Sequence, residues 1–291
     1  NLNSYYDVNL KKNKIKNLKE NNNFFFKKVD LLNKKKINKI VKDNRIKQII
    51  HLAAQAGVRD SINNPEIYFK SNLEGFFNIL EISKQNKIKH LIFASTSSVY
   101  GDSSKFPLNE NMPTDSPLSF YAATKKSNEV MAYSYSNIYN LPITALRFFT
   151  VYGPYGRPDM SLFKFTKSII DNNKINLFNG GDHIRDFTYV DDISSGILGL
   201  INKPSVKSIP YNCFNIGSSK PTNLKKFLST IEKNLGKKAK INNLPIQNGD
   251  VKKTHASINL LSKYSSYKPK IGIDKGVKEF VNWYKEYYKK K

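Results

Sequence analysis

The chain has 291 residues, a formal net charge of +25 and a single cysteine, Cys213. Its length suits one large α/β domain, or a domain with a smaller lobe, and one cysteine excludes a disulfide framework. No apolar run is long enough to span a membrane, and the first residues carry no apolar signal region. We therefore expect a cytoplasmic protein that makes no membrane contact.

The positive charge comes from 48 lysines and arginines spread along the whole chain. No basic segment forms a recognisable nucleic-acid-binding module, so the charge indicates solvated surfaces and a general affinity for anions. We expect no nucleic-acid partner, although a basic nucleic-acid-binding protein is the rival class. The four histidines show no ligand spacing, so we also predict no metal: His51, His90, His183 and His255.

Apolar periodicity predicts alternating strands and helices in the first half of the chain. Residues 1–23 show no clear period. The predicted elements then follow in chain order: a strand over 24–30 that ends in an acid, a short helix over 33–43, a strand buried on both faces over 48–53, a helix from 64 to about 84, a buried strand over 90–94, a long helix over 121–139 and a strand over 141–149.

Beyond about residue 150 the pattern is less regular. Helices are predicted over 161–172, 190–201 and 224–235, and short strands over 175–178 and 214–216. Strands that alternate with helices indicate an α/β fold with a doubly wound parallel sheet. We expect residues 1–150 to form the main domain and residues 151–291 a smaller lobe, with some segments returning to the main sheet.

The most specific chemical signal is Tyr121 followed four residues later by Lys125. This spacing on a helix puts the phenol and the ammonium on one face, one turn apart. A cation there favours the phenolate and lowers the tyrosine pKa, so Tyr121 is a candidate base for a sugar or alcohol hydroxyl. Alone the pattern is weak, because an exposed Tyr and Lys on a helix would give the same match.

A run of hydroxyls strengthens the case. Ser95, Thr96, Ser97 and Ser98 follow the buried strand over 90–94. Open α/β sheets bind ligands beyond the carboxyl ends of their strands, where such hydroxyls can reach a substrate oxygen. The other reading is a Ser/Thr turn that caps the next segment.

Ordered motifs along the chain resemble the extended short-chain dehydrogenase/reductase family, in its nucleotide-sugar epimerase branch. The resemblance covers essentially the whole chain. It rests on the sequences at 51–59, 95–98, 121–125, 147–160, 185–192 and 249–251. It implies a Rossmann-like fold, tightly bound NAD and epimerisation at C4 of a UDP-sugar through a transient 4-keto intermediate, with UDP-glucuronate to UDP-galacturonate as the expected reaction. It also suggests a homodimer formed by the helices near 65–84 and 121–139.

The resemblance implies a role for individual residues. The expected catalytic residues are Tyr121 as base, Lys125 on the nicotinamide ribose and Thr96 on the reacting sugar oxygen. The other residues expected on NAD are Asp30, Leu52, Ala53, Ala54, Gln55, Asn72 and Ser95. Those expected on the UDP-sugar are Ser97, Ser98, Thr150, Arg157, Arg185 and Asp250. Among these, Arg185 resembles the arginine on the diphosphate, where a planar guanidinium suits paired oxygens.

One departure from the family pattern and several rival functions bear on this interpretation. The first glycine is Gly57, so the glycine-rich turn of a Rossmann site is absent and the sequence reads as a fragment lacking the first strand. We therefore expect weak NAD binding by this chain, or a non-catalytic remnant. Ser97 and Ser98 argue against a 4,6-dehydratase, and Thr150 against UDP-glucose 4-epimerase. A UDP-glucuronate decarboxylase stays open.

Overall fold

The computed structural model describes residues 2–247 and 249–290. Its main sheet has four parallel strands in the order β1-β2-β3-β7. These are β1 (Gln48–His51), β2 (His90–Thr96), β3 (Ile143–Phe148) and β7 (Tyr211–Ile216). β7 comes from the second half of the chain and completes the sheet. The α/β class with a parallel sheet is confirmed.

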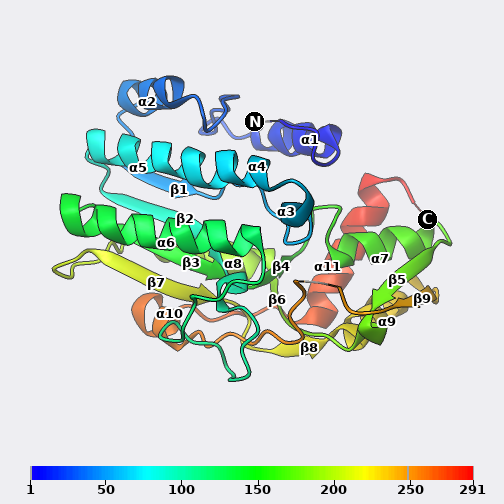
Figure 1. The fold of residues 1–291 in the computed structure, drawn as a ribbon. Helices are drawn as coiled ribbons and strands as arrows, with labels where there is room; N and C mark the ends of the chain where they lie inside the picture. Colours follow the sequence, from blue (N-terminus) through cyan, green and yellow to red (C-terminus); the bar gives the residue numbers. More distant parts are fainter. Residues whose placement is uncertain (1, 248, 291) are drawn as a thin grey trace.

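Helices cover both faces of this sheet (Figure 1). One face packs against α2 (Lys34–Asp43), α5 (Gly75–Gln85) and α6 (Phe120–Tyr139). The other face packs against α8 (Val190–Leu198) and α10 (Asn259–Ser265). Because β2 is enclosed on both faces, all seven of its residues are buried. This explains the unbroken apolar run that the sequence shows there.

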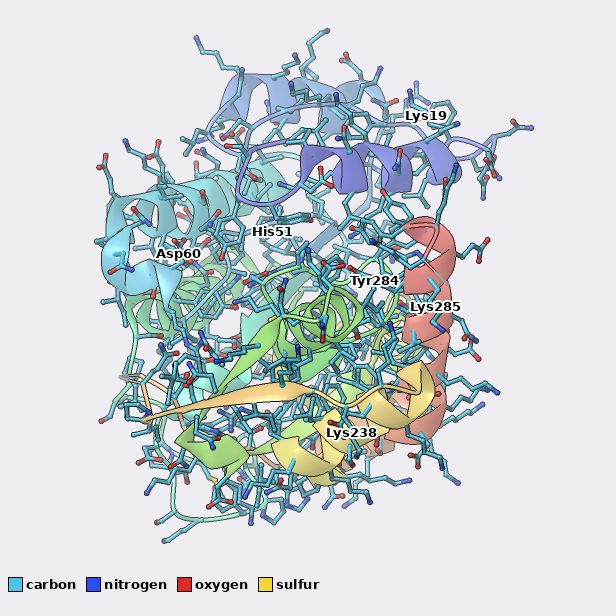
Figure 2. The ribbon with its side chains drawn as sticks, turned by 90° about the vertical axis from the view of Figure 1, so that its right-hand side faces the viewer. Lys19, His51, Asp60, Lys238, Tyr284 and Lys285 are labelled. Carbon is cyan, nitrogen blue, oxygen red and sulfur yellow. The ribbon has the colours of Figure 1, made fainter. Side chains whose placement is uncertain are left out.

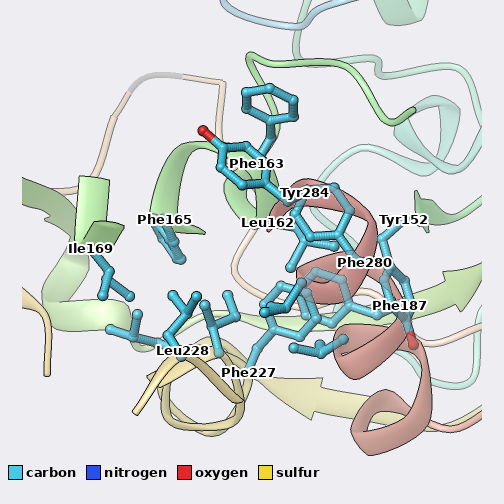
Figure 3. Close-up of a cluster of buried hydrophobic side chains, with 14 of the residues drawn as sticks. Tyr152, Leu162, Phe163, Phe165, Ile169, Phe187, Phe227, Leu228, Phe280 and Tyr284 are labelled. Carbon is cyan, nitrogen blue, oxygen red and sulfur yellow. The ribbon is translucent and has the colours of Figure 1, made fainter. Parts of the chain in front are cut away.

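The remaining strands form two small sheets. One has the order β4-β6-β8, with β4 (Thr150–Tyr152), β6 (Ile184–Tyr189) and β8 (Pro221–Asn223), and the other pairs β5 (Lys174–Phe178) with β9 (Lys240–Leu244). An aromatic cluster joins them to α7 (Ser161–Ile170), α9 (Leu224–Leu235) and α11 (Ile273–Tyr287) (Figure 3). Within it the Phe187 and Phe227 rings stack with centroids 4.0 Å apart.

The prediction for residues 1–23 was incomplete, because they contain helix α1 (Val8–Leu18). Asp7 caps the helix by accepting a hydrogen bond from the Asn9 amide. Only Leu10 is buried, so a helix rich in Lys and Asn shows almost no apolar period. α1 lies beside the end of α11 (Figure 2), where Asn13 donates a hydrogen bond to the Tyr287 hydroxyl at 2.6 Å.

Two strand predictions at this end of the sheet need correction. Residues 24–30 are irregular, because no described strand pairs with them. β1 was expected to be buried on both faces, yet it is an edge strand of the described sheet. Ile50 is 40% exposed and Leu52, just beyond it, is 50% exposed. Strand length and hydrophobicity alone do not tell an edge from a centre.

The helix predicted from Asn64 to Lys84 is broken into shorter segments. α3 (Asp60–Asn63) precedes α4 (Pro65–Tyr68), and a π-helical segment η1 (Phe69–Glu74) leads into α5. Pro65 takes the first helical position as expected, but the Asn64 side chain donates to Asp60 and does not cap. Among residues 2–247 and 249–290, no helix has the length and apolarity needed to cross a bilayer.

Several elements were not predicted at all, and they fall mostly in the second half. Short strands give little periodic signal, and α11 lies after a stretch with no clear pattern. Besides α1 and α3, the unpredicted elements are β4, β6, β8, β9, α10, α11 and the short helical turns η2 (Ser97–Tyr100) and η3 (Asn179–Gly181).

A buried ion pair ties the main sheet to α6. Glu129 of α6 accepts two hydrogen bonds from Arg147 of β3, at 2.9 and 2.8 Å, and one from Ser95 of β2 at 2.5 Å. Both charged side chains are nearly fully buried. Arg147 also donates to the Tyr100 hydroxyl, which in turn donates to Asn215 of β7. One network therefore connects three strands to the helix that carries Tyr121 and Lys125.

We predict that Glu129→Ala lowers the free energy of unfolding by about 3–5 kcal/mol, because it leaves the Arg147 guanidinium buried without its counter-charge. Urea unfolding followed by circular dichroism measures the loss. The double variant Glu129→Leu/Arg147→Met should recover much of it, since an apolar pair leaves no buried charge. A double variant as unstable as the single one would show that the pair is not the cause.

Candidate active site

A cleft of about 1560 Å³ lies at the carboxyl ends of β2 and β3 and is lined on its other side by the small sheets. Open α/β sheets place their ligands there. The structure brings most of the predicted site residues to this one cleft. Those that line it are Leu52, Ala54, Ser95, Thr96, Ser97, Ser98, Tyr121, Lys125, Thr150, Arg157, Arg185 and Asp250.

The start of α6 fixes the two most specific residues. Ser119 caps the helix by accepting a hydrogen bond from the Ala122 amide, and the Tyr121 amide donates to Ser61. Lys125 follows one turn later, as predicted. Its ammonium is buried and donates to the Ala94 carbonyl of β2 at 2.7 Å. The helix thus presents Tyr121 and Lys125 together at the end of the strand.

The electrostatics differ from the expectation that Lys125 lowers the pKa of Tyr121. Burial raises that pKa, while a hydrogen bond with Thr96 and the charge of Arg157 lower it by less. Burial also lowers the pKa of Lys125 to about 8, partly offset by the Glu129 carboxylate. The ammonium donates to a backbone carbonyl, and the cation whose charge lowers the pKa of the phenol is Arg157.

The hydroxyl run serves two purposes. Thr96 accepts a hydrogen bond from the Ser98 amide and caps the turn η2, which is the structural role that the sequence left open. Thr96 also contacts the Tyr121 phenol. Ser95 is turned to Glu129, and Ser97 and Ser98 are half-buried in the cleft. Thr96 therefore joins the turn to the candidate base.

Thr150 and Arg157 lie in the same cleft as Tyr121, at the start of β4 and in the loop after it. The Arg157 side chain is 28% exposed, and its guanidinium is already paired with Asp159. A threonine hydroxyl and an arginine in one cleft can hold an anionic group of a ligand.

A second cluster of polar side chains lies elsewhere in the cleft. Arg59 donates to the Asp250 carboxylate at 2.8 Å and stacks 4.8 Å from the Phe178 ring. Arg185 donates to the carbonyls of Ile184 and Lys252, and burial lowers the pKa of Arg185. Two arginines and a carboxylate at one end can bind phosphates and sugar hydroxyls.

Four of the predicted cofactor residues are not among those that line the cleft. Asp30 accepts a hydrogen bond from the Leu32 amide, and Ala53 is exposed at the end of β1. Gln55 and Asn72 are buried against each other: the Asn72 amide exchanges hydrogen bonds with the Gln55 backbone at 2.8 and 3.0 Å. Asn72 thus fixes the course of the loop behind Ala54.

Among the cleft residues that the sequence did not predict are Tyr5, Arg59 and Asp159. Arg59 and Asp159 fall inside motifs that were singled out at 51–59 and 147–160, so the motifs carried the signal. Tyr5 lies in a polar segment without periodicity and could be placed only by the fold. Within residues 2–247 and 249–290, no group of three or more His, Cys, Asp or Glu side chains could hold a metal ion.

A parallel sheet with a tyrosine and a lysine at the carboxyl end of a central strand defines a short-chain dehydrogenase/reductase type of site. Residues 2–217 match the NAD dependent epimerase/dehydratase family. The chain belongs to this family and is an NAD-dependent epimerase.

Several relatives are only slightly longer than this chain. The protein is 48% identical to Protein CapI of Staphylococcus aureus, over 99% of this chain and 90% of that protein. It is 43% identical to UDP-glucuronate 4-epimerase of Thermodesulfobacterium geofontis, over 98% and 87%. The crystal structure of UDP-glucuronic acid 4-epimerase from Bacillus cereus, in complex with UDP-glucuronic acid and NAD, superposes with a TM-score of 0.90 at 34% identity, over 97% of this chain and 88% of that one.

We predict that Lys125→Met raises the free energy of unfolding at pH 7. Burial holds the pKa of Lys125 near 8, against an ordinary value of 10.5, which corresponds to a cost of up to about 3 kcal/mol for the charged form. Between these two values the unfolded chain binds the extra proton, so the parent gains stability as pH rises and the advantage of the variant shrinks.

Thermal unfolding of both proteins at pH 7 and pH 10 measures this difference. Lys39→Met is the matched control, because Lys39 is exposed on α2. It should change stability by less than about 0.5 kcal/mol. A Lys125→Met protein that is less stable than the parent at both pH values would contradict the prediction.

Proposed function

We propose that UDP-glucuronate is the substrate of this NAD-dependent UDP-sugar 4-epimerase, and that the product is UDP-galacturonate. The observation that carries the proposal is Arg157, which lies in the cleft close enough to Tyr121 for its charge to lower the pKa of the phenol. A fixed cation beside the candidate base favours a sugar with a carboxylate. The names of the Thermodesulfobacterium and Bacillus cereus relatives support the same substrate.

The two ends of the cleft suit the two parts of such a substrate. We propose that Arg185 binds the diphosphate and Asp250 the uridine ribose, because both line the end where Arg59 and Phe178 also lie. The uronic acid would then lie toward Tyr121. In this arrangement residues 151–291 contribute mainly to the UDP-sugar, and residues 1–150 to the cofactor.

The residues that would hold NAD surround the end of β2. The buried Lys125 would meet the nicotinamide ribose, with Ser95 nearby and the backbone from Leu52 to Gln55 along the cofactor. Asn72 would act through its hydrogen bonds to Gln55, and Asp30 would meet the adenine. NAD, when bound, supplies the acceptor and donor of hydride.

The protein's own contribution is proton transfer and orientation. Tyr121 takes the proton from the sugar C4 hydroxyl, and Thr96, which contacts the phenol, holds the same oxygen. Ser97, Ser98 and Thr150 line the space around the sugar. The 4-keto sugar then presents its other face before the proton is returned to the oxygen at C4. Burial raises the pKa of Tyr121, and the Thr96 hydrogen bond and the charge of Arg157 offset part of that rise.

We predict that Tyr121→Phe lowers kcat by about 10² to 10⁴-fold, the usual effect of losing a general base. The variant keeps the ring and loses only the hydroxyl, so its thermal unfolding midpoint should stay close to that of the parent. Conversion of UDP-glucuronate followed by chromatography measures the rate. Turnover close to the parent rate would remove Tyr121 from the mechanism.

Kinetics of an Arg157 variant test the proposed substrate. We predict that the parent prefers UDP-glucuronate to UDP-glucose, and that Arg157→Ala loses about 10- to 100-fold more in kcat/KM for the uronate than for UDP-glucose, because a charged hydrogen bond contributes about 1.5–3 kcal/mol. Kinetics on both substrates give the ratio. A parent that prefers UDP-glucose, or a variant that keeps the full preference, would contradict the assignment.

We also propose that two chains associate through α5 and α6, which lie side by side on one face of the sheet (Figure 1). Both helices expose large apolar side chains: Phe77 is 43%, Val130 58% and Ile138 63% exposed. Large apolar side chains exposed on neighbouring helices are typical of an interface.

We predict that Val130→Glu/Ile138→Glu converts a dimer to a monomer, as measured by light scattering. Leu198→Glu is the control, because Leu198 is 66% exposed on α8, on the other face of the sheet, and the variant should stay dimeric. A parent that elutes as a monomer would refute the proposed interface.

A further inference from the structure

The cleft contains a carboxylate that binds Arg157 from within the chain. The Asp159 carboxylate accepts two hydrogen bonds from Arg157, from Nε at 2.9 Å and from Nη2 at 2.5 Å. The two residues are separated only by Pro158, in the loop between β4 and α7. Although burial raises the pKa of Asp159, the hydrogen bond and charge of Arg157 lower it below its ordinary value, so the carboxylate is charged at neutral pH.

Tyr5 contacts both members of the Arg157–Asp159 pair. Its hydroxyl donates a long hydrogen bond to Oδ2 of Asp159 at 3.4 Å, and its ring centroid lies 5.9 Å from the Arg157 guanidinium carbon. Tyr5 belongs to the segment before α1, far away in sequence. The pair is therefore fixed between two segments of the chain, both of which line the cleft.

The geometry leaves part of the guanidinium for a ligand. An arginine has five N–H groups, and Asp159 takes one from Nε and one from Nη2, along one edge of the fork. Among the described residues, Nη1 of Arg157 has no hydrogen-bond partner. The edge formed by Nη1 and Nη2 can still bind a second carboxylate through two parallel hydrogen bonds.

We propose that Asp159 is a positioning residue that sets the preference of the enzyme for an acidic sugar, by holding Arg157 with its outer edge available to the substrate carboxylate. This inference rests on the proposed function. An arginine side chain without such a partner samples many rotamers, and a fork that is already oriented loses less freedom when the ligand binds. Asp159 itself touches neither the sugar nor the cofactor in this arrangement.

The test compares Asp159→Asn, Asp159→Glu and the parent on UDP-glucuronate and on UDP-glucose. Asparagine keeps the size but replaces one acceptor with a donor that opposes the Arg157 N–H. We expect KM for UDP-glucuronate to rise about tenfold in Asp159→Asn, with kcat within about twofold and with both constants for UDP-glucose unchanged. Asp159→Glu keeps a carboxylate and should restore at least part of the affinity.

Asp171→Asn is the matched control, because it removes the same charge from an exposed pair with Lys167 outside the cleft. It should leave the kinetics on both substrates unchanged. Thermal unfolding midpoints of all variants show whether each one is folded, and calorimetric titration of UDP-glucuronate gives its affinity without turnover.

Each of the remaining outcomes contradicts one of two claims: the role of Asp159 or the proposed substrate. A KM for UDP-glucuronate that falls in Asp159→Asn would mean that Asp159 competes with the substrate, and an equal rise for both sugars would mean a purely structural role; either overturns the proposal. A parent that prefers UDP-glucose overturns the proposed function, before any variant is compared. A parent that prefers the uronate, together with an Asp159→Asn variant that keeps the full preference, overturns only the role of Asp159.

Discussion

The buried pair between Glu129 and Arg147 is the constraint on which the site depends. It joins α6 to β3, and through Ser95 to β2, in a region where neither charge can reach water. Burying two charges is costly unless their geometry is good and their other hydrogen bonds are made. That requirement fixes the angle of α6 on the sheet. Because Tyr121 and Lys125 lie on the preceding turns of the same helix, their position at the end of β2 follows.

Carboxylate partners also orient two arginines of the cleft. Arg59 is paired with Asp250 and Arg157 with Asp159, so two of its guanidinium groups already have a carboxylate partner before any ligand arrives. Each carboxylate orients a planar guanidinium group and offsets part of the positive charge in the cleft. The catalytic end is different: Lys125 is turned to a backbone carbonyl, and its pKa is lowered by burial to about 8. Lys125 thus differs from these two arginines, because a backbone carbonyl and not a carboxylate accepts its hydrogen bond.

The departures from the sequence predictions share a physical origin. Residues 24–30 have strand-like composition but no described partner strand, and β1 is more exposed than its apolar sequence suggests. Strand formation depends on neighbours that a local pattern cannot show. The π-helical segment η1 likewise interrupts a good helical period, while Asn72 within it bonds to the Gln55 backbone. In each of these segments, the neighbours that the fold provides determined the structure more than local propensity did.

The sequence by itself determined the α/β class, the central strands, α6 and the placement of Tyr121 and Lys125 one turn apart, because these follow from periodicity and helical spacing. Its ordered motifs also led to most of the residues that line the cleft. Only the tertiary structure decided that Lys125 donates to the Ala94 carbonyl, that Thr96 contacts the phenol, and that Tyr5 and Asp159 contact Arg157. Such relations join segments far apart in the chain or depend on side-chain direction, and neither is encoded in a local pattern.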